Sequence, residues 1–350
     1  MVREGVSEPY HRQHPRVAVA SVRGRATIPA AAADKLEAVA DVRYFTAEQA
    51  LSRAEAVAAF AGADIVAFTP KVAPPVDEEL LDALPGLRGI ALYATGYDFL
   101  DLELLSSYGV TLTYLPAYST TSVAEHALGM LLTLARRIHL ANDRSRGLVP
   151  AETSLRGFEL AGRTLGVVGF GRIGSTFGQL AQGLGMRILA VDSRCVRVGA
   201  ADARHVPFGD MLRRADAVAV LCSAGHDREP ILGTAEIACM RPGAVLVNAS
   251  RAHLVDADAV AAAIRTRQLR GYAVDDVVFG PWKHSDLLTE GRIVQTGHSA
   301  WWSDEVLERG GTMWAERIRR LALCDPVDVV PAAHRRGGER LPDHEEGSLS

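Results

Sequence analysis

The sequence predicts an α/β protein with two doubly wound parallel sheets. Short runs of β-branched and apolar residues alternate with helical patterns almost throughout the chain, and this alternation is typical of parallel strands covered by helices on both faces. The length of 350 residues favours two domains over a single hydrophobic core. A long apolar helix, expected at about 121–141, separates two such alternating series. We therefore predict two α/β units.

In the first series, each predicted strand is followed by a predicted helix. The strands are expected at 16–21 (RVAVAS), 41–45 (DVRYF), 63–68 (ADIVAF), 87–92 (LRGIAL) and 109–114 (GVTLTY). The segments between them have helical spacing or residues that favour a helix start, at 28–40, 47–60, 77–85 and 101–108.

The second series follows the long helix and has the same alternation. Its strands are expected at 164–171 (TLGVVGFG), 187–192 (RILAVD), 216–222 (DAVAVLC), 244–250 (AVLVNAS), 271–276 (GYAVDD) and 292–296 (RIVQT). The two ends of the chain, 1–14 and 332–350, are polar and contain glycine and proline, so we expect them to be disordered.

The composition is that of a soluble globular protein, with 48% apolar and 23% charged residues. A net charge of −4 gives no electrostatic reason to expect nucleic acid or an anionic membrane as a partner. The N-terminus lacks the apolar core of a secretory signal, and the apolar stretch 123–140 contains Glu, His and Arg. The scattered cysteines lack metal-ligand spacing, so we expect no metal, buried thiols at Cys195, Cys222 and Cys239, and a cytoplasmic protein.

A glycine motif directly follows the first strand of the second series and opens a helix. Gly169 permits a tight turn, Gly171 lets the backbone approach a pyrophosphate, and Gly174 lets helix and strand pack closely. Asp192 ends the next strand, where a carboxylate can bind both ribose hydroxyls and would repel a 2′-phosphate. The pattern predicts a Rossmann domain that binds NAD. Arg194 leaves NADP as an alternative, and a turn without any ligand is the other interpretation.

Four stretches, in order along the chain, resemble the D-isomer-specific 2-hydroxyacid dehydrogenases. They are 94–137 (ATGYDF…TLARR), 159–174 (ELAGRTLGVVGFGRIG), 247–260 (VNASRAHLVDADAV) and 296–320 (TGHSAWWSDEVLERGGTMWAERIRR). The resemblance spans about residues 60–320, and the wording His-Ser-Ala-Trp-Trp-Ser is nearest to the branch containing the C-terminal-binding protein corepressors.

The resemblance implies an NAD-dependent oxidoreductase whose cofactor domain is inserted into a split substrate domain. The implied substrate domain is 15–118 plus 299–331, and the implied NAD-binding Rossmann domain is 119–298. It also implies an active site in the cleft between these domains, and a homodimer with the long helix at or near the interface. The implied substrate is a 2-oxo or 2-hydroxy acid.

Two catalytic residues follow from the matching blocks. Arg251 has a guanidinium that can hold a 2-oxo acid bidentately and polarise the carbonyl that accepts hydride. Capping of a helix or pairing with Asp256 is the structural alternative for this arginine. His298 would protonate the developing alkoxide; a purely structural histidine is its alternative.

The same blocks imply residues that contact substrate and cofactor. Thr95, Gly96 and Tyr97 match the loop whose backbone N–H groups bind the substrate carboxylate, although the usual Asp-Asn there is Asp98-Phe99. Trp301 is expected to line the substrate pocket and to favour an apolar or aromatic 2-oxo acid. For Glu125 and His126 we favour helix packing or an interface. The implied cofactor contacts, beyond the three glycines and Asp192, are Ser122, Arg172, Ile173, Cys222, Ala249 and Asp275.

The chain departs from the family pattern at two positions. The family's catalytic Glu before a proline is Gly280 here, before Pro281, so His298 lacks its usual partner. The family's Thr-Pro-His is Thr296-Gly297-His298, which we expect to loosen the backbone around the histidine. Nearby groups that could compensate or contact substrate are Asp276, Asp286 and His284.

Three functional hypotheses remain open from the sequence. The first is an NAD-dependent oxidoreductase with an atypical site, the second a relative with non-standard biosynthetic chemistry, and the third an NAD(H)-sensing binding protein. Retention of Arg251, His298 and Asp275 favours an enzyme, because a binding protein needs no arginine–histidine pair.

Overall fold

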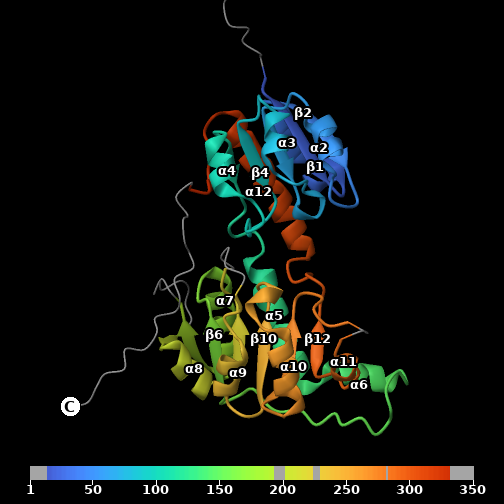
Figure 1. Ribbon diagram of the computed structural model, residues 1–350, viewed down its shortest axis with the longest axis vertical. Coiled ribbons are helices and arrows are strands. Elements are labelled where there is room, and N and C mark those ends of the chain that lie inside the picture. The colour runs from blue at the N-terminus through green and yellow to red at the C-terminus, as the bar shows by residue number, and fades with distance from the viewer. Residues whose placement is uncertain (1–13, 193–201, 224–228, 281–282, 332–350) are drawn as a thin grey trace, which may run out of the picture. The chain divides into compact units, whose positions relative to one another are not determined.

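The computed structural model describes residues 14–192, 202–223, 229–280 and 283–331 and divides the chain into two compact units (Figure 1). Among the described residues, unit 1 combines 14–118 with 304–331, and unit 2 comprises those within Ser119–Ser303. Each unit contains one parallel sheet, so the predicted α/β fold with two parallel-sheet units is confirmed. The predicted disordered ends lie outside the described residues, apart from His14.

Unit 1 has a five-stranded parallel sheet in the order β2-β1-β3-β4-β5. Its strands are β1 (Arg16–Ser21), β2 (Asp41–Thr46), β3 (Ile65–Phe68), β4 (Gly89–Leu92) and β5 (Thr111–Thr113). Its helices are α1 (Ala30–Glu37), α2 (Arg53–Phe60), α3 (Glu78–Asp82), α4 (Leu102–Ser107) and α12 (Asp304–Ala322), with 3₁₀ turns η1 (Gly24–Thr27) and η2 (Pro70–Val72). All five strands predicted for this unit are present.

Local chemistry explains how elements of unit 1 begin and pack. Helix α2 begins after Ser52, whose side chain accepts from the Glu55 amide while the Glu55 carboxylate accepts from the Ser52 amide, so a capping box sets its start. Helix α12 returns to the sheet of unit 1, where the buried Trp314 indole donates a hydrogen bond to the Ala91 carbonyl at 2.9 Å.

Unit 2 has a seven-stranded parallel sheet in the order β12-β11-β10-β9-β6-β7-β8. Its strands are β6 (Thr164–Val168), β7 (Arg187–Val191), β8 (Ala203–His205), β9 (Ala217–Val220), β10 (Ala244–Asn248), β11 (Leu269–Val274) and β12 (Ile293–Gln295). Its helices are α5 (Thr120–Arg136), α6 (Ile138–Ser145), α7 (Arg172–Gly183), α8 (Phe208–Arg214), α9 (Thr234–Cys239), α10 (Ala257–Arg265) and α11 (Ser285–Thr289), with the 3₁₀ turn η3 (Ala252–Leu254).

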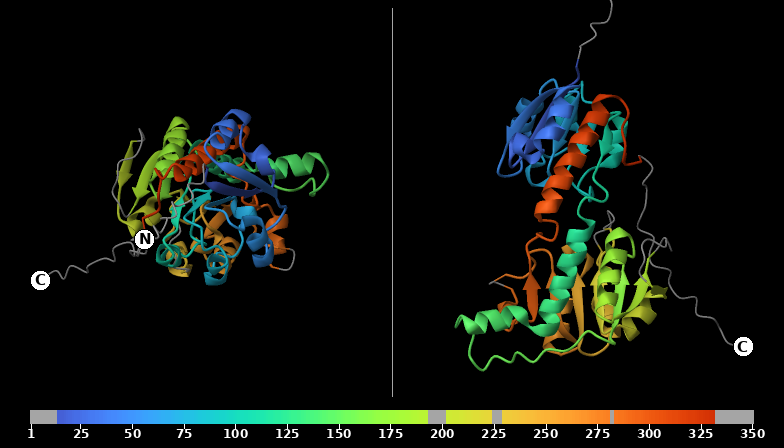
Figure 2. Two further views of the ribbon diagram at one scale, coloured as in Figure 1. Left: turned by 90° about the horizontal axis from the view of Figure 1, so that it is seen from above. Right: turned by 180° about the vertical axis from the view of Figure 1, so that it is seen from behind.

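Helices cover both faces of the unit 2 sheet, because alternate strand residues point to opposite sides. Leu246 of β10 packs with residues of α8, α9 and α10, whereas its neighbours Val245 and Val247 pack with α5 and α7. Figure 1 shows α8, α9 and α10 on the near face, and the right-hand view of Figure 2 shows α5 across the other face. This double coverage explains why the strands read as continuous apolar runs.

The prediction of a single long helix at about 121–141 is wrong, because the chain forms two helices there. α5 ends at Arg136 and α6 begins at Ile138, and Arg137 between them adopts the left-handed conformation with φ 54° and ψ 40°. The Phe158 amide donates to the Ala135 carbonyl at 2.8 Å, which a continuing helix would have used for the amide four residues later. A distant segment therefore sets the end of α5.

Two smaller differences concern an edge strand and the cysteines. Strand β8 was not predicted, because it has only three residues and two of them are exposed. Cys239 is exposed and Cys222 only partly buried, so the expectation of buried thiols is wrong for Cys239, and Cys195 lies outside the described residues. No helix in the described part of the chain is long and apolar enough to cross a membrane.

Candidate functional site

In the unit 2 sheet, β6 lies between β7 and β9. The glycine turn that follows β6 is therefore at the point where the order of the strands reverses direction. Gly169 has φ +89°, and a Cβ atom there would lie 2.4 Å from the Cys222 backbone. A Cβ atom on Gly174 would lie 2.0 Å from the Gly169 carbonyl oxygen. At Gly171, by contrast, a Cβ would have no atom of the described residues within 4 Å. The first and third glycines are therefore required sterically, and the second leaves open space for a ligand.

Asp192, at the carboxyl end of β7, is tied to this turn by a hydrogen bond. Its Oδ2 accepts from the Phe170 amide at 2.7 Å, a contact that the sequence motif does not predict. Helix α7 begins at Arg172, and the first amides of a helix lack intrahelical acceptors and favour a phosphate. The turn, the helix start and this carboxylate together fit the pyrophosphate and ribose of a dinucleotide.

A buried asparagine fixes the segment that carries Arg251. Asn248 ends β10 and is 1% exposed. Its amide nitrogen donates to the Arg251 carbonyl at 2.9 Å, and its side-chain oxygen accepts from the Ser250 amide at 3.0 Å. The Ser250 hydroxyl in turn donates to the Cys222 carbonyl. These bonds tie the turn that carries Arg251 to β10 and to the end of β9. Arg251 itself is partly buried.

Arg251 does not cap helix α10, and its pairing with Asp256 stays a prediction. Helix α10 is capped by Asp256, whose Oδ1 accepts from the amides of Asp258 at 2.9 Å and Ala259 at 3.0 Å. Arg251 instead precedes the 3₁₀ turn η3 and donates from Nη1 to the Ser250 carbonyl at 3.4 Å.

His298 lies in a loop after β12 that one buried carboxylate holds on both sides. Asp275, only 7% exposed, accepts at Oδ1 from the Thr296 hydroxyl at 2.7 Å and the Ser299 amide at 2.8 Å. Its Oδ2 accepts from the Ala300 amide at 3.0 Å. The carboxylate therefore bonds to residues before and after His298. The expected contact of Asp275 with the nicotinamide stays a prediction beside this observed role.

Helix α5 contributes two further bonds to this loop. Ser122 donates from its hydroxyl to the Ala300 carbonyl at 2.9 Å, and His126 Nε2 lies 2.9 Å from the Thr296 hydroxyl oxygen. His126 Nε2 is also 3.8 Å from Asp275 Oδ1. These distances specify the packing predicted for His126, because its ring contacts the loop that carries His298.

Gly297 and His298 both have a φ of +61°. Proline fixes φ near −65°, so the family's Thr-Pro-His could not follow this backbone path. We expected the glycine to loosen the backbone around the histidine. In the structure, the loop follows a left-handed turn that glycine permits, and the bonds from Asp275 and Ser122 hold it.

Within the described residues, no carboxylate bonds to the His298 side chain. Asp276 accepts from the neighbouring Val277 amide at 2.8 Å, and Asp286 is paired with Arg265 at 2.9 Å. Gly280 is buried and closes a tight turn with Lys283, in which the Lys283 amide donates to the Gly280 carbonyl at 3.0 Å. Pro281 lies outside the described residues. Neither acid considered as a replacement for the missing Glu contacts the histidine.

His284 is held by protein groups on both ring nitrogens. Its Nε2 is 3.0 Å from Asp258 Oδ1, and its Nδ1 is 3.1 Å from Arg265 Nη2. Its ring also packs beside Phe279, with ring centroids 5.8 Å apart. These contacts give His284 a structural role.

The remaining predicted substrate contacts are spread over both units. In unit 2, the Trp301 ring lies 5.0 Å from that of Trp302, and Trp302 is 65% exposed. In unit 1, the Thr95 hydroxyl donates to the Leu115 carbonyl at 2.8 Å, Gly96 follows it, and the Tyr97 ring packs edge-on against Tyr114 at 5.2 Å. Of the remaining predicted cofactor residues, Ile173 lies in α7 within the glycine motif, and Ala249 follows β10 two residues before Arg251.

The glycine turn, Asp192 and the reversal of strand order define unit 2 as a dinucleotide-binding domain of the Rossmann type. Comparison with known proteins identifies the family. Residues 128–300 match the family described as D-isomer specific 2-hydroxyacid dehydrogenase, NAD binding domain. The chain belongs to this family of NAD-binding oxidoreductases, and its cofactor is NAD.

Individual relatives support this assignment. The chain is 31% identical over 245 residues to a glyoxylate reductase of Thermococcus onnurineus, covering 67% of this chain and 73% of that protein. It is 33% identical to a D-3-phosphoglycerate dehydrogenase of Mycobacterium leprae, covering 80% of this chain and 53% of the relative, so it spans about half the length of that relative. Among solved structures, the TT0316 protein of Thermus thermophilus aligns with a TM-score of 0.77 and 28% identity, covering 89% of this chain and 98% of that one.

Proposed function

We propose that this protein transfers hydride between NAD(H) and a 2-oxo or 2-hydroxy acid, with Arg251 and His298 as its catalytic residues. The observation that carries this proposal is the Asp275 carboxylate, which holds the His298 loop on both sides. Arg251 and His298 follow the carboxyl ends of β10 and β12, which flank β11 in the unit 2 sheet. The carboxyl edge of a doubly wound parallel sheet is where such folds bind ligands.

The two side chains have complementary chemical roles in this proposal. The Arg251 guanidinium binds the substrate carboxylate through parallel N–H donors and stabilises negative charge on the carbonyl oxygen during reduction. His298 donates a proton to that oxygen, and in the oxidative direction it accepts the proton from the hydroxyl. NADH, when bound at the glycine turn, supplies the hydride.

We infer the finer features of the enzyme from the family resemblance. Unit 1 would act as the substrate domain, with the backbone of Thr95, Gly96 and Tyr97 binding the carboxylate. Trp301 would select an apolar or aromatic 2-oxo acid, as in the branch that contains the C-terminal-binding protein corepressors. A homodimer formed near α5 and a cytoplasmic location complete the proposal.

A second candidate function is NAD(H) sensing without efficient turnover. The observation that favours it is that His298 makes no bond to a carboxylate among the described residues. A paired carboxylate orients the imidazole and stabilises the imidazolium, and positioned acid–base groups contribute about 10²–10⁴-fold in rate. The same observation suits non-standard chemistry on a biosynthetic substrate that supplies its own acid.

Turnover against a panel of 2-oxo acids tests the proposed function. We expect the purified protein to oxidise NADH with at least one apolar, branched or aromatic 2-oxo acid, because Trp301 favours such side chains. NADH should be preferred to NADPH, because Asp192 would repel a 2′-phosphate. Absorbance at the reduced-nicotinamide band measures both, with a reaction lacking oxo acid as control. Tight NADH binding with no turnover on any acid would instead favour NAD(H) sensing or non-standard chemistry on another substrate.

Restoring the missing carboxylate should raise activity. We expect Gly280→Glu to increase kcat for 2-oxo acid reduction by about tenfold, because a paired carboxylate orients the imidazole and stabilises the imidazolium.

Gly280→Gln is the matched control, because it adds a side chain of the same size without the charge. The activity of this control should be unchanged or lower. Because Gly280 is buried, the melting temperature of both variants should also be measured. Lower activity of a well-folded Gly280→Glu variant would show that a substrate group or a different network needs that space.

A further inference from the structure

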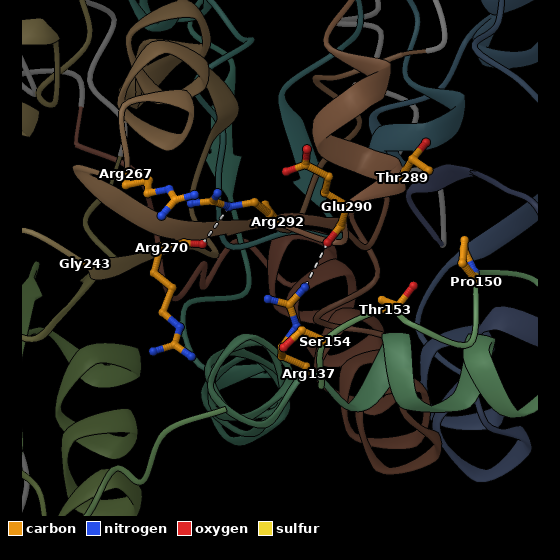
Figure 3. A pocket seen from close by; sticks show the side chains of 10 residues that line it. All are labelled: Arg137, Pro150, Thr153, Ser154, Gly243, Arg267, Arg270, Thr289, Glu290 and Arg292. Atoms are coloured by element: carbon orange, nitrogen blue, oxygen red, sulfur yellow. Dashed lines mark hydrogen bonds between the residues drawn. The ribbon is translucent and has the colours of Figure 1, made fainter. Parts of the chain in front are cut away.

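A second site lies at the opposite, amino edge of the unit 2 sheet. The pocket has a volume of about 720 Å³ and is lined by Arg137, Arg267, Arg270, Arg292, Thr153 and Ser154, among others (Figure 3). Arg270 is the second residue of β11, and Arg292 immediately precedes β12. Because the strands are parallel, these starts lie at the edge opposite to the loop of His298. The pocket is therefore separate from the proposed catalytic residues of this unit.

The charge of this pocket is positive, with one acid, Glu290, beside four arginines among the described residues that line it. Arg137 contacts Glu290 through the main-chain carbonyl, at 3.0 Å from Nη2, and Figure 3 shows the Glu290 carboxylate turned away from Arg137. Within the described part of the chain, none of the four guanidinium groups forms an ion pair with a carboxylate.

Main-chain carbonyls hold these arginines in place while leaving donors unused. Arg292 Nη2 donates to the Leu269 carbonyl at 3.0 Å, and Arg270 Nη2 donates to the Arg156 carbonyl at 2.8 Å. Each guanidinium carries five N–H donors, so these contacts satisfy only a part of them. The Arg137 Nε is buried with no hydrogen-bond partner among the described residues. The pocket thus presents oriented donors that an added acceptor could satisfy.

The arginines of this pocket repel their neighbours, as the lowered pKa values of two of them show. Burial lowers the pKa of Arg270, and Arg137, Arg163, Arg156 and Arg292 lower it further by repulsion. Burial and Arg292 likewise lower the pKa of Arg137.

Arg267 adds a backbone cost to this repulsion. Its φ is +65°, a left-handed conformation that glycine adopts far more readily than a residue with a Cβ. A bound anion would offset the repulsion, and it would give Arg267 a partner at a position where glycine would otherwise be preferred.

We propose that this pocket binds a small oxyanion with at least two negative charges, either a phosphate ester or a di- or tricarboxylate. Guanidinium groups recognise both classes through the same bidentate pairing of two N–H donors with two oxygens. The volume suits a metabolite, since small-molecule sites measure about 300–1,000 Å³. The hydroxyls of Thr153 and Ser154 add neutral donors or acceptors on one side.

Citrate and pyrophosphate are the probes that test this site. The experiment uses the full-length protein saturated with NADH, so that the glycine turn is already filled and cannot bind pyrophosphate. Calorimetric titration should show one site per chain for at least one probe, weakening as ionic strength rises. The melting temperature should rise by roughly 5 °C at saturating anion, compared with sodium chloride of equal ionic strength.

Two variants of pocket residues and one control variant test where the anion binds. Arg267→Gly and Arg270→Gln should each weaken anion binding at least tenfold. Arg267→Gly is informative because glycine suits φ +65°, so the unliganded variant should melt no lower than the parent. Arg214→Gln, which removes an exposed arginine at the end of α8, is the matched control and should bind the anion like the parent.

Three results would overturn the proposal. One is the absence of binding by both probes, and another is equal binding by the parent and the two pocket variants. The third is an anion effect that depends on protein concentration and coincides with a change in oligomeric state by sedimentation. That result would mean that a second copy of the chain, and not a small anion, occupies the arginine pocket.

Discussion

Replacing Arg251 with alanine should lower kcat/KM for every 2-oxo acid substrate by at least about 10³-fold while leaving the affinity for NADH unchanged. Loss of one donor to a developing oxyanion typically costs about 10²–10³-fold in kcat, and Arg251 additionally binds the substrate carboxylate. The segment itself should stay folded, because Asn248 holds it through the Arg251 main-chain carbonyl and the Ser250 amide. These main-chain contacts survive removal of the Arg251 side chain.

Steady-state kinetics and a fluorescence titration with NADH measure the two effects separately. His253→Ala is the matched control, since His253 is exposed in the adjacent 3₁₀ turn, and it should leave both parameters near those of the parent. Arg251→Lys keeps the charge but loses the planar fork, so its activity should be intermediate. Undiminished turnover by the Arg251→Ala variant would show that other residues bind the substrate carboxylate.

Replacing Asp275 with alanine should reduce kcat by about 10²–10³-fold and lower the free energy of unfolding by about 2–4 kcal/mol. The change leaves the Thr296 hydroxyl and the amides of Ser299 and Ala300 without their shared acceptor. An unsatisfied buried donor costs about 1–3 kcal/mol, which applies to the buried Ala300 amide, whereas Thr296 is partly buried and Ser299 is exposed. The loop then no longer holds His298 in one place, so proton transfer slows.

Asp276→Ala is a close control, because the neighbouring carboxylate bonds only to the Val277 amide among the described residues. It should change both kcat and the melting temperature little. Chemical denaturation and the pH profile of kcat provide the readouts. A positioning role for Asp275 predicts a lower rate at every pH without a shift of the profile, whereas a raised Kd for NADH would add support for the predicted nicotinamide contact. Normal activity of Asp275→Ala would refute the positioning role.

Most of the fold could be predicted from the sequence because buried parallel strands have a strong local pattern. The runs at 16–21 and 187–192 each contain four consecutive apolar residues, at 17–20 and 188–191, and each forms a strand. Strand β8 has no such pattern, since it is short and exposed at the sheet edge. The break at Arg137 depends on Phe158, more than twenty residues away, whose amide bonds to the end of α5. Local periodicity could not indicate that contact.

The candidate site likewise combines a part that depends on neighbouring residues with a part that depends on residues far apart in the sequence. The glycine turn is a contiguous motif, so its backbone geometry could be predicted. The support of His298 by Asp275 joins residues more than twenty positions apart, and which amides point at the carboxylate depends on the left-handed turn at Gly297. The arginine pocket collects side chains from positions 137 to 292. No spacing rule connects these positions, so the pocket could not be predicted from the sequence.

The contact between Gly169 and Cys222 has a consequence for redox chemistry. Burial raises the pKa of the Cys222 thiol to about 11, so roughly one molecule in ten thousand carries a thiolate there at neutral pH. Thiolates, not thiols, attack disulfides and peroxides. Of the described cysteines, Cys239 and Cys324 are the exposed ones, and neither belongs to the proposed site. At neutral pH the Cys222 thiol beside the glycine turn is therefore a poor nucleophile towards disulfides and peroxides.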